Sequence, residues 1–217
     1  MTNQAKFWDK FAERYAKSPI ADEAAYQKKL QITREYFNHD SAVLEIGCGT
    51  GSTAILHAPH VKYIHATDIS AKMVAIAQRK LEAEKIDNIT FEQSAINELK
   101  IDEGSIDVVM AHSILHLVDN RDDVIAKTYR LLKPGGVLVS STICPGDSML
   151  RFLKPIISLG KFLGFLPSVM IFSAKALESS ITNAGFEIDY RWLPGKGKAL
   201  FIVAKKGPGR TILNIND

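Results

Sequence analysis

The chain has 217 residues, of which 46% are hydrophobic and 24% are charged, and its formal net charge at pH 7 is +3. This length is enough for one domain with a sizeable buried core, whereas the small, dispersed charge argues against nucleic acid as a partner. The two cysteines, Cys48 and Cys144, are too few for a disulfide framework and lack the spacing of metal ligands. We therefore expect no metal site. The polar N-terminus has no apolar segment typical of a signal peptide, so we expect a cytoplasmic protein.

The beginning of the chain is predicted to form two helices. In the first, Phe7, Phe11 and Tyr15 recur every four residues and therefore share one face. Pro19 breaks this helix, and the second extends from about Asp22 to about Phe37.

The middle of the chain alternates between short apolar segments and helical patterns. The predicted strands are Ala42–Ile46, Val61–Thr67, Ile89–Glu92, Ser105–Ala111 and Val137–Ile143. Ser70 has the residue type and position of a helix N-cap, and a later helix from Arg121 to Leu132 stops where proline and glycine follow at 133–136. Strands and helices that alternate at this spacing predict a parallel sheet covered on both faces.

The last part of the chain departs from this alternation. After a helix that ends near Gly185, two predicted strands, Phe186–Leu193 and Ala199–Lys205, follow each other across a short, turn-rich link. Such a link favours an antiparallel hairpin. The sequence thus predicts an α/β fold whose doubly wound, mostly parallel sheet ends in a reversed strand.

The first candidate binding site is a glycine-rich segment directly after the first predicted strand. Gly47, Gly49 and Gly51 let the backbone turn sharply and let a ligand approach it closely, and the N-terminus of the following helix favours an anionic group. Asp68, at the end of the second strand, can accept hydrogen bonds from both hydroxyls of a ribose. Together these features indicate a nucleoside-containing cofactor.

Two further positions bear on the type of nucleoside. A dinucleotide-binding loop follows the pattern G-x-G-x-x-G, and here Ser52 stands where its third glycine would be. Glu45, shortly before the first glycine, would repel a pyrophosphate but complement an ammonium or a sulfonium. The loop therefore favours a zwitterionic cofactor, with a nicotinamide-dependent oxidoreductase as the less favoured alternative.

Four segments resemble motifs of the class I S-adenosylmethionine-dependent methyltransferases, in that family's order and spacing. They are Val43–Gly51, which is similar to motif I, Thr67–Ser70 with Met73, Ile106–Val109 with Leu115 and His116, and Leu131–Gly136. The resemblance is to the small-molecule branch of the family and covers nearly the whole chain. It implies a Rossmann-like fold with a seven-stranded sheet, S-adenosylmethionine as cofactor, S-adenosylhomocysteine as product and a small-molecule methyl acceptor.

The resemblance also divides the chain into parts of one methyltransferase domain over residues 1–217. They are N-terminal helices or a lid at 1–40, a cofactor-binding core at 41–143, a hydrophobic insert or lid at 144–172, the last helix and hairpin at 173–206, and a tail at 207–217. A reversed last strand is a property of this family, in agreement with the predicted hairpin.

For the methionine end of the cofactor, the resemblance implies contacts from the ends of two strands. Gly47, Cys48 and Gly49 would bind the methionine moiety through their backbone. Ala111 and His112, at the end of the fourth strand, would face the methionine amino group and the transferring methyl.

For the nucleoside end, the resemblance implies a second group of contacts. Asp68 would hold the ribose hydroxyls, and Ile69 and Met73 would flank the adenine ring. Ser94 and Ala95 would read the adenine edge, although an aspartate is common in the family where Ser94 stands here.

The chemistry is expected to depend mainly on alignment. The sulfonium already makes the methyl group electrophilic, and holding an acceptor in line with it can supply about 7–11 kcal/mol of a barrier in favourable cases. A general base is needed only for an acceptor that is protonated at working pH, and His112 or Tyr15 could then serve. Tyr15 and Tyr26 could also form a lid over the cofactor, or could only pack between helices. Glu45 would order the glycine loop from beneath, and His116 is expected to be structural.

The segment Met149–Phe172 bears most on the acceptor. It is rich in leucine, isoleucine and phenylalanine, but Arg151, Lys154 and Lys161 interrupt it, so it lacks the roughly 20 consecutive apolar residues of a membrane-spanning helix. We expect a lid of short helices over an apolar or amphiphilic acceptor. A core-packing subdomain and a peripheral lipid contact are alternatives for the segment, and a non-catalytic cofactor-binding module is an alternative for the protein.

Overall fold

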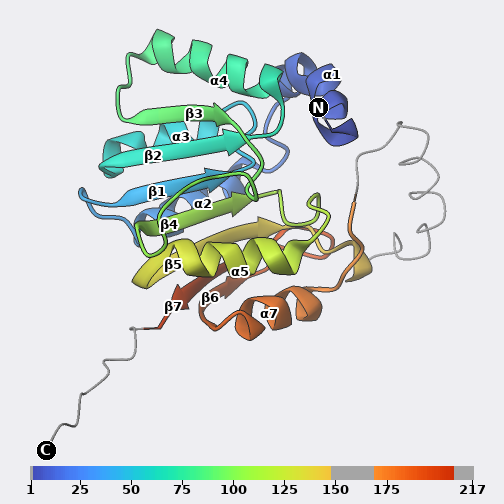
Figure 1. The fold of residues 1–217 in the computed structure, drawn as a ribbon. Coiled ribbons are helices and arrows are strands. Elements are labelled where there is room, and N and C mark those ends of the chain that lie inside the picture. The colour runs from blue at the N-terminus through green and yellow to red at the C-terminus, as the bar shows by residue number, and fades with distance from the viewer. Residues whose placement is uncertain (1, 148–168, 208–217) are drawn as a thin grey trace, which may run out of the picture.

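The computed structural model describes residues 2–147 and 169–207, and its centre is one seven-stranded sheet (Figure 1). The strands are β1 (Ala42–Ile46), β2 (Tyr63–Asp68), β3 (Ile89–Gln93), β4 (Ile106–His112), β5 (Leu132–Thr142), β6 (Phe186–Trp192) and β7 (Leu200–Lys206). Their order in the sheet is β3-β2-β1-β4-β5-β7-β6. β1 to β5 run parallel, and β7 lies antiparallel between β5 and β6. The predicted doubly wound sheet with a reversed last strand is confirmed.

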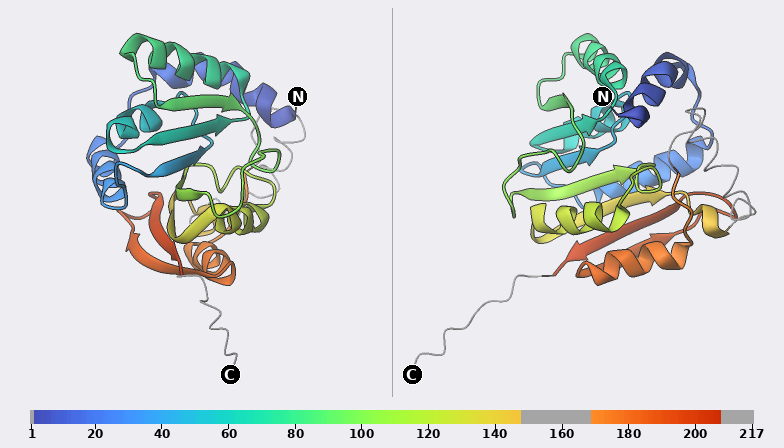
Figure 2. Two further views of the ribbon diagram at one scale, coloured as in Figure 1. Left: turned by 60° about the vertical axis from the view of Figure 1, so that its left-hand side comes forward. Right: turned by 45° about the vertical axis from the view of Figure 1, so that its right-hand side comes forward.

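Helices cover both faces of this sheet (Figure 2). They are α1 (Asn3–Lys17), α2 (Glu23–Arg34), α3 (Ser52–His57), α4 (Ala71–Glu84), α5 (Arg121–Leu131) and α7 (Ala174–Asn183), with short 3₁₀ helices η1 (Ala58–His60) and η2 (Pro145–Asp147). One buried cluster, which includes Leu138 and Leu177, joins α5 and α7 to one face of the sheet. A second cluster, which includes Ile32 and Met110, joins α2, α3 and α4 to the other face. The inner strands β1, β4 and β7 are mostly apolar because the sheet is buried on both faces there, whereas the edge strands β3 and β6 carry exposed polar residues.

β5 begins earlier than the sequence predicts. The sequence predicts a break at residues 133–136 and a strand from Val137, whereas β5 starts at Leu132, directly after the end of α5. The register between β4 and β5 shifts in this region, so a bulge absorbs the additional residues. Gly135 has a positive φ of 79°, a conformation that glycine adopts without steric cost.

α4 begins at the residue that the sequence predicts, and α1 is anchored there. The Ser70 hydroxyl accepts a hydrogen bond from the Met73 N–H at 3.1 Å, which confirms Ser70 as the N-cap. Asp9 of α1 in turn accepts hydrogen bonds from the Ser70 hydroxyl at 2.6 Å and from the Lys72 N–H at 3.1 Å. Ala12 packs against Met73 in the same contact. α1 is therefore held across the carboxyl end of β2, where α4 starts.

The predicted insert at 144–172 is described only at its two ends, and residues 148–168 lie outside the described residues. The Gly146 N–H donates to the Phe172 carbonyl at 2.8 Å, which brings the two ends together. In the described ranges, no helix has the length and apolar character that crossing a membrane requires. The division into a core, lids and a tail stays a prediction.

Candidate functional site

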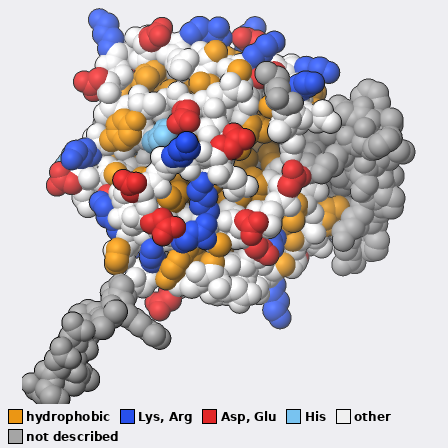
Figure 3. Space-filling view, in the orientation of Figure 1, with side chains coloured by type: hydrophobic (Ala, Val, Ile, Leu, Met, Phe, Trp, Pro, Cys, Tyr) orange, Lys and Arg blue, Asp and Glu red, His pale blue; other side chains and the backbone are white. Residues whose placement is uncertain are grey.

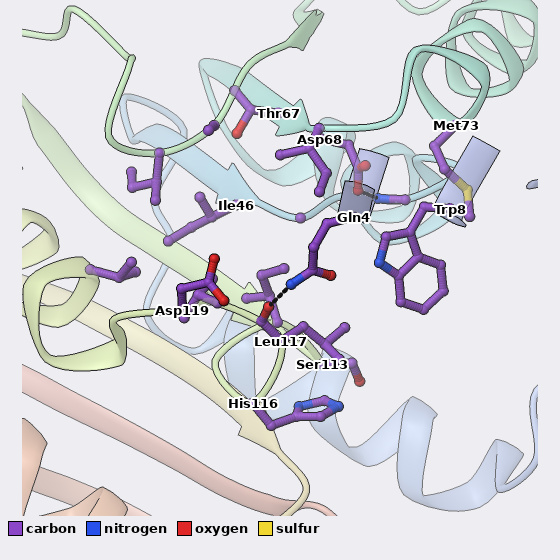
Figure 4. Close-up of a pocket in the computed structure, with 18 of the residues that line it drawn as sticks. Gln4, Trp8, Ile46, Thr67, Asp68, Met73, Ser113, His116, Leu117 and Asp119 are labelled. Carbon is purple, nitrogen blue, oxygen red and sulfur yellow. Dashed lines mark hydrogen bonds between the residues drawn. The ribbon is translucent and has the colours of Figure 1, made fainter. Parts of the chain in front are cut away.

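The carboxyl ends of β1, β2 and β4 border a cavity of about 670 Å³, which α1 covers on one side (Figure 4). Ligands of open α/β sheets bind outside the carboxyl ends of the strands, where the strand order reverses. Most of the predicted cofactor residues line this cavity: Tyr15, Gly47, Gly49, Asp68, Ile69, Met73, Ser94, Ala95 and His112. Glu45, Cys48 and Ala111 are buried at 2%, 8% and 0% exposure and do not line it.

The glycine loop after β1 needs glycine for steric reasons. Gly47 has a φ of +67°, and a Cβ atom there would lie 2.7 Å from the side chain of Ile114. Cys48 donates from its N–H to the Thr67 carbonyl at 2.9 Å, which joins the loop to β2. The Cys48 side chain is buried, and the loop presents its backbone to the cavity at Gly47 and Gly49.

Asp68 connects this loop with the start of α4. Its Oδ2 accepts a hydrogen bond from the Gly49 N–H at 3.0 Å, and its Oδ1 accepts one from the Ser70 N–H at 2.8 Å. Burial raises the pKa of Asp68, and the nearby charge of Asp9 adds to this, while the backbone hydrogen bonds oppose the rise. The carboxylate is thus held in one orientation at the cavity wall, with lone pairs left for a ligand.

Glu45 lies beneath the loop. Its Oε2 is buried without a hydrogen-bond partner, and burial, followed by the charge of Asp68, raises the pKa of Glu45 to about 8. The carboxyl group is therefore largely protonated at neutral pH. A cation in the cavity would favour its ionised form.

Two imidazoles line the cavity, His112 from the end of β4 and His116 from the segment that follows it. Burial lowers the pKa of His112 to about 4, with the charge of Lys29 as a second cause, and burial also lowers the pKa of His116 to about 4. Both side chains are therefore neutral at physiological pH. Nε2 of His112 and Nδ1 of His116 are buried without hydrogen-bond partners. Neither ring therefore has, at that nitrogen, the hydrogen bond to a third group that orients an activated general base. The sequence predicts a structural role for His116, whereas its ring lines the cavity (Figure 4).

Of the two tyrosines predicted for a lid, only Tyr15 lines the cavity. Its ring lies near the glycine loop, since a Cβ atom on Gly49 would be 3.7 Å from Tyr15 Cε1. Burial of the hydroxyl, followed by the charge of Asp68, raises the pKa of Tyr15, which keeps the phenol protonated. Tyr26 instead shares a hydrogen bond of 3.2 Å with the hydroxyl of Thr53.

Sequence reasoning missed two residues of α1 that line the cavity, Gln4 and Trp8. The Gln4 Nε2 donates to the Leu117 carbonyl at 2.8 Å and so ties α1 to the segment after β4. The indole of Trp8 lies beside Met73 (Figure 4). Their spacing carries no signal of this role, because the position of α1 depends on its contacts with distant parts of the chain.

The remaining wall of the cavity is mostly apolar. Its apolar side chains include Ile114, Leu117, Val118, Val124, Ile143 and Val169, and its uncharged polar side chains include Asn97, Ser113 and Asn120. Among the described residues that line the cavity there is no lysine or arginine, and the acidic side chains are Asp68 and Asp119. These surroundings suit apolar and cationic groups better than anionic ones.

Known proteins share both the sequence pattern and this fold. A family described as a methyltransferase domain matches residues 43–136, which include the glycine loop, Asp68 and β4. This match, with the relatives and solved structures that share it, supports the resemblance to the class I S-adenosylmethionine-dependent methyltransferases. The resemblance seen in the sequence is thereby confirmed.

The names of proteins related to this methyltransferase domain state different methyl acceptors. A malonyl-[acyl-carrier protein] O-methyltransferase of Priestia megaterium is 31% identical, over 84% of this chain and 65% of its own length. The tRNA N(3)-cytidine methyltransferase METTL2B of Homo sapiens is 29% identical, over 92% of this chain and 59% of its own length. The chain thus spans less than two thirds of either relative.

A solved structure shows the same fold at low identity. The geranyl diphosphate C-methyltransferase of Streptomyces coelicolor A3(2), crystallised with S-adenosyl-L-homocysteine, has a TM-score of 0.68 and 14% identity to this methyltransferase domain. The match covers 83% of this chain and 79% of the other. Family membership therefore leaves the acceptor to be argued from the cavity.

Proposed function

We propose that this methyltransferase domain binds S-adenosylmethionine and transfers its methyl group to a small, apolar or amphiphilic acceptor. The observation that supports this most directly is a single cavity in which the glycine loop and Asp68 meet an apolar wall. Its volume of about 670 Å³ is in the usual range for sites of small ligands.

The residues of the cavity fit a nucleoside linked to an amino acid. Asp68 would hold the ribose hydroxyls, and the backbone of Gly47 and Gly49 would hold the methionine part. Ile69 and Met73 would flank the adenine ring, since soft apolar side chains pack well on its faces.

Further proposed contacts come from the next strand ends. Ser94 and Ala95 would read the edge of the adenine, and His112 would face the methionine amino group. Cys48 and Ala111 would act from behind the wall, Cys48 through its backbone and Ala111 by packing.

Glu45 provides a test of fit between the site and the cofactor. Its unpartnered buried oxygen would be stabilised as a carboxylate by the sulfonium and ammonium charges of S-adenosylmethionine. A pyrophosphate would instead lie near the carboxyl groups of Glu45 and Asp68, without a lysine or arginine among the described lining residues. This argues against the nicotinamide alternative.

When bound, S-adenosylmethionine supplies an electrophilic methyl group, and the chain has to align an acceptor with it. α1 excludes water from one side of the cavity through Trp8, and Gln4 ties the helix to Leu117. His112 and His116 are neutral and weakly basic, so they would hold the acceptor by hydrogen bonds and would not remove a proton. We therefore expect acceptors that are nucleophilic as they stand.

The names of the relatives include acceptors with negative charge, such as tRNA and geranyl diphosphate. A phosphate inside this cavity would find no lysine or arginine on the described wall. We expect the apolar part of an acceptor to enter the cavity, where it gains roughly 25 cal/mol per Å² of buried apolar surface.

Thermal denaturation with candidate ligands tests the cofactor. S-adenosylmethionine and S-adenosylhomocysteine should raise the melting temperature, because a ligand at a hundredfold excess over its Kd adds about 2.7 kcal/mol of stability. Reduced nicotinamide dinucleotide should leave it unchanged, and the reverse result would contradict the proposal. Methyl transfer to a series of acceptors of rising apolar area then tests the acceptor class, since equal rates across the series would exclude an apolar subsite.

A further inference from the structure

α1 carries charges of both signs, and packing separates them. Its acidic side chains turn towards α4, where Asp9 accepts hydrogen bonds from the Ser70 hydroxyl at 2.6 Å and the Lys72 N–H at 3.1 Å. Glu13 pairs with Arg79 at 3.2 Å. The acidic side of the helix is therefore engaged with the rest of the molecule.

The basic side chains of α1 form a row next to these acidic side chains, which we call the basic row: Lys6, Lys10, Arg14 and Lys17. All four are exposed, and within the described part of the chain no ion pair involves any of them. Three of them recur every four residues, which places them on one face of the helix. In Figure 3, lysine and arginine side chains lie along the upper edge of the molecule, where α4 and α1 lie, with acidic side chains between them.

An aromatic pair lies next to the basic row. Phe7 and Phe11 stack with their ring centroids 4.6 Å apart, and Phe11 is 38% exposed. The buried positions of α1 are Ala5 and Ala12, so the aromatic pair lies outside the face that packs on the domain. Each phenylalanine directly follows a residue of the basic row, which gives α1 an outward side that is both basic and aromatic.

This outward side continues into the cavity. The ring of Phe7 meets the indole of Trp8 edge to face, with centroids 5.4 Å apart, and Trp8 lines the cavity. Tyr15 follows Phe11 by one helical turn and lines the cavity as well. A surface that bound α1 from outside would therefore lie beside the cavity.

We propose that the outward side of α1, formed by the basic row with Phe7 and Phe11, docks on an anionic lipid surface. Basic side chains are attracted to anionic headgroups, and neighbouring aromatic rings enter the boundary between headgroups and acyl chains. An acidic protein would match the charge alone, whereas a bilayer matches the charge, the exposed ring of Phe11 and the partly exposed ring of Phe7. The role of this docking depends on the proposed function. If the acceptor is apolar and dissolved in the bilayer, docking by α1 would place the cavity next to it.

Vesicle co-sedimentation tests this proposal with vesicles of phosphatidylcholine alone and with added phosphatidylglycerol. The protein should bind the anionic vesicles and not the neutral ones. The charge reversals Lys10→Glu and Arg14→Glu together should weaken binding about tenfold or more, since each basic residue near an anionic surface contributes about 1 kcal/mol. Phe7→Ser with Phe11→Ser should also weaken it severalfold.

The matched control reverses two exposed lysines outside α1, Lys62→Glu directly before β2 with Lys100→Glu in the loop before β4, and should leave vesicle binding intact. Equal binding to neutral and anionic vesicles, or equal loss in the control, would overturn the proposal. Loss by charge reversal with full binding after the Phe7 and Phe11 changes would also overturn it, and would indicate an electrostatic site for an acidic macromolecule.

Cofactor affinity, measured by calorimetry on the same variants, separates this proposal from the proposed function. Vesicle binding lost with S-adenosylmethionine affinity retained would support lipid docking by α1. A protein that bound anionic vesicles but no S-adenosylmethionine would contradict the proposed function and would leave the lipid surface supported.

Discussion

Asp68 combines two tasks in one side chain, since its carboxylate accepts hydrogen bonds from the Gly49 and Ser70 N–H groups and also lines the cavity. Asp68→Asn keeps the shape but replaces one acceptor oxygen by a donor, which leaves either a backbone N–H or a ribose hydroxyl unpaired. Such a loss costs about 1–3 kcal/mol, so calorimetry should show about tenfold or greater weakening of S-adenosylmethionine binding. Asp102→Asn, at an exposed position, is the control. Unchanged affinity would show that the ribose lies elsewhere.

The raised pKa of Glu45 predicts how the free energy of unfolding depends on pH. Because its pKa in the folded protein is about 8 and its ordinary value is 4.5, the folded state keeps a proton that the unfolded chain loses between these values. The free energy of unfolding of the wild type therefore falls from this cause as pH rises from about 4.5 to 8. Glu45→Gln removes this contribution.

The difference between the melting temperature of Glu45→Gln and that of the wild type should therefore shift in favour of the variant, towards a higher relative value, as the pH rises from about 4.5 to 8. Cofactor affinity should fall, because the amide cannot ionise to complement the sulfonium. Glu98→Gln, at an exposed position, should show neither effect. A relative melting temperature that fell with rising pH would contradict the assigned direction of the Glu45 shift.

At the scale of elements, α1 is attached to the domain at both ends of the cavity, by Asp9 at the start of α4 and by Gln4 at the Leu117 carbonyl. Asp9→Asn weakens the first attachment, because the side chain loses its charge beside the N-terminus of α4. We expect a loss of about 0.5–2 kcal/mol in stability and faster dissociation of the cofactor, measured by stopped-flow fluorescence. Glu23→Gln on α2 is the matched control. An unchanged dissociation rate would show that α1 does not limit access to the cavity.

At the scale of the whole molecule, buried neutral histidines should make the protein sensitive to acid. Burial lowers the pKa of His57 to about 3, and those of His112 and His116 to about 4. The unfolded chain binds these protons near pH 6.5 while the folded state does not, so the free energy of unfolding should fall as pH drops from about 6.5 towards 4. Glu45 and Asp68, whose carboxyl pKa values are raised by burial, contribute in the opposite direction.

His57→Leu isolates one of these groups, since neither ring nitrogen of His57 has a hydrogen-bond partner. When the pH is lowered from 6.5 to 4, the melting temperature of this variant should decrease less than that of the wild type. His39→Leu, at an exposed position, should follow the wild type. Parallel melting curves for His57→Leu and the wild type would show that His57 does not contribute to acid sensitivity.

The sequence by itself determined the order of strands and helices, the reversed last strand and the glycine loop with Asp68. These follow from local causes: apolar runs of strand length, a serine at a helix start, and backbone conformations that favour glycine. β5 shows the limit of such reasoning, because its early start depends on pairing with β4 across a bulge.

Only the tertiary structure decided which residues share the cavity. Glu45 and Cys48 belong to a predicted motif and Ala111 is a predicted cofactor contact, but all three lie behind the wall. Gln4 and Trp8 line the cavity without belonging to any motif. The hydrogen bond that places α1 joins residues 113 positions apart in the chain. A contact of this range depends on how the two segments pack on the sheet, and local residue patterns carry no information about it.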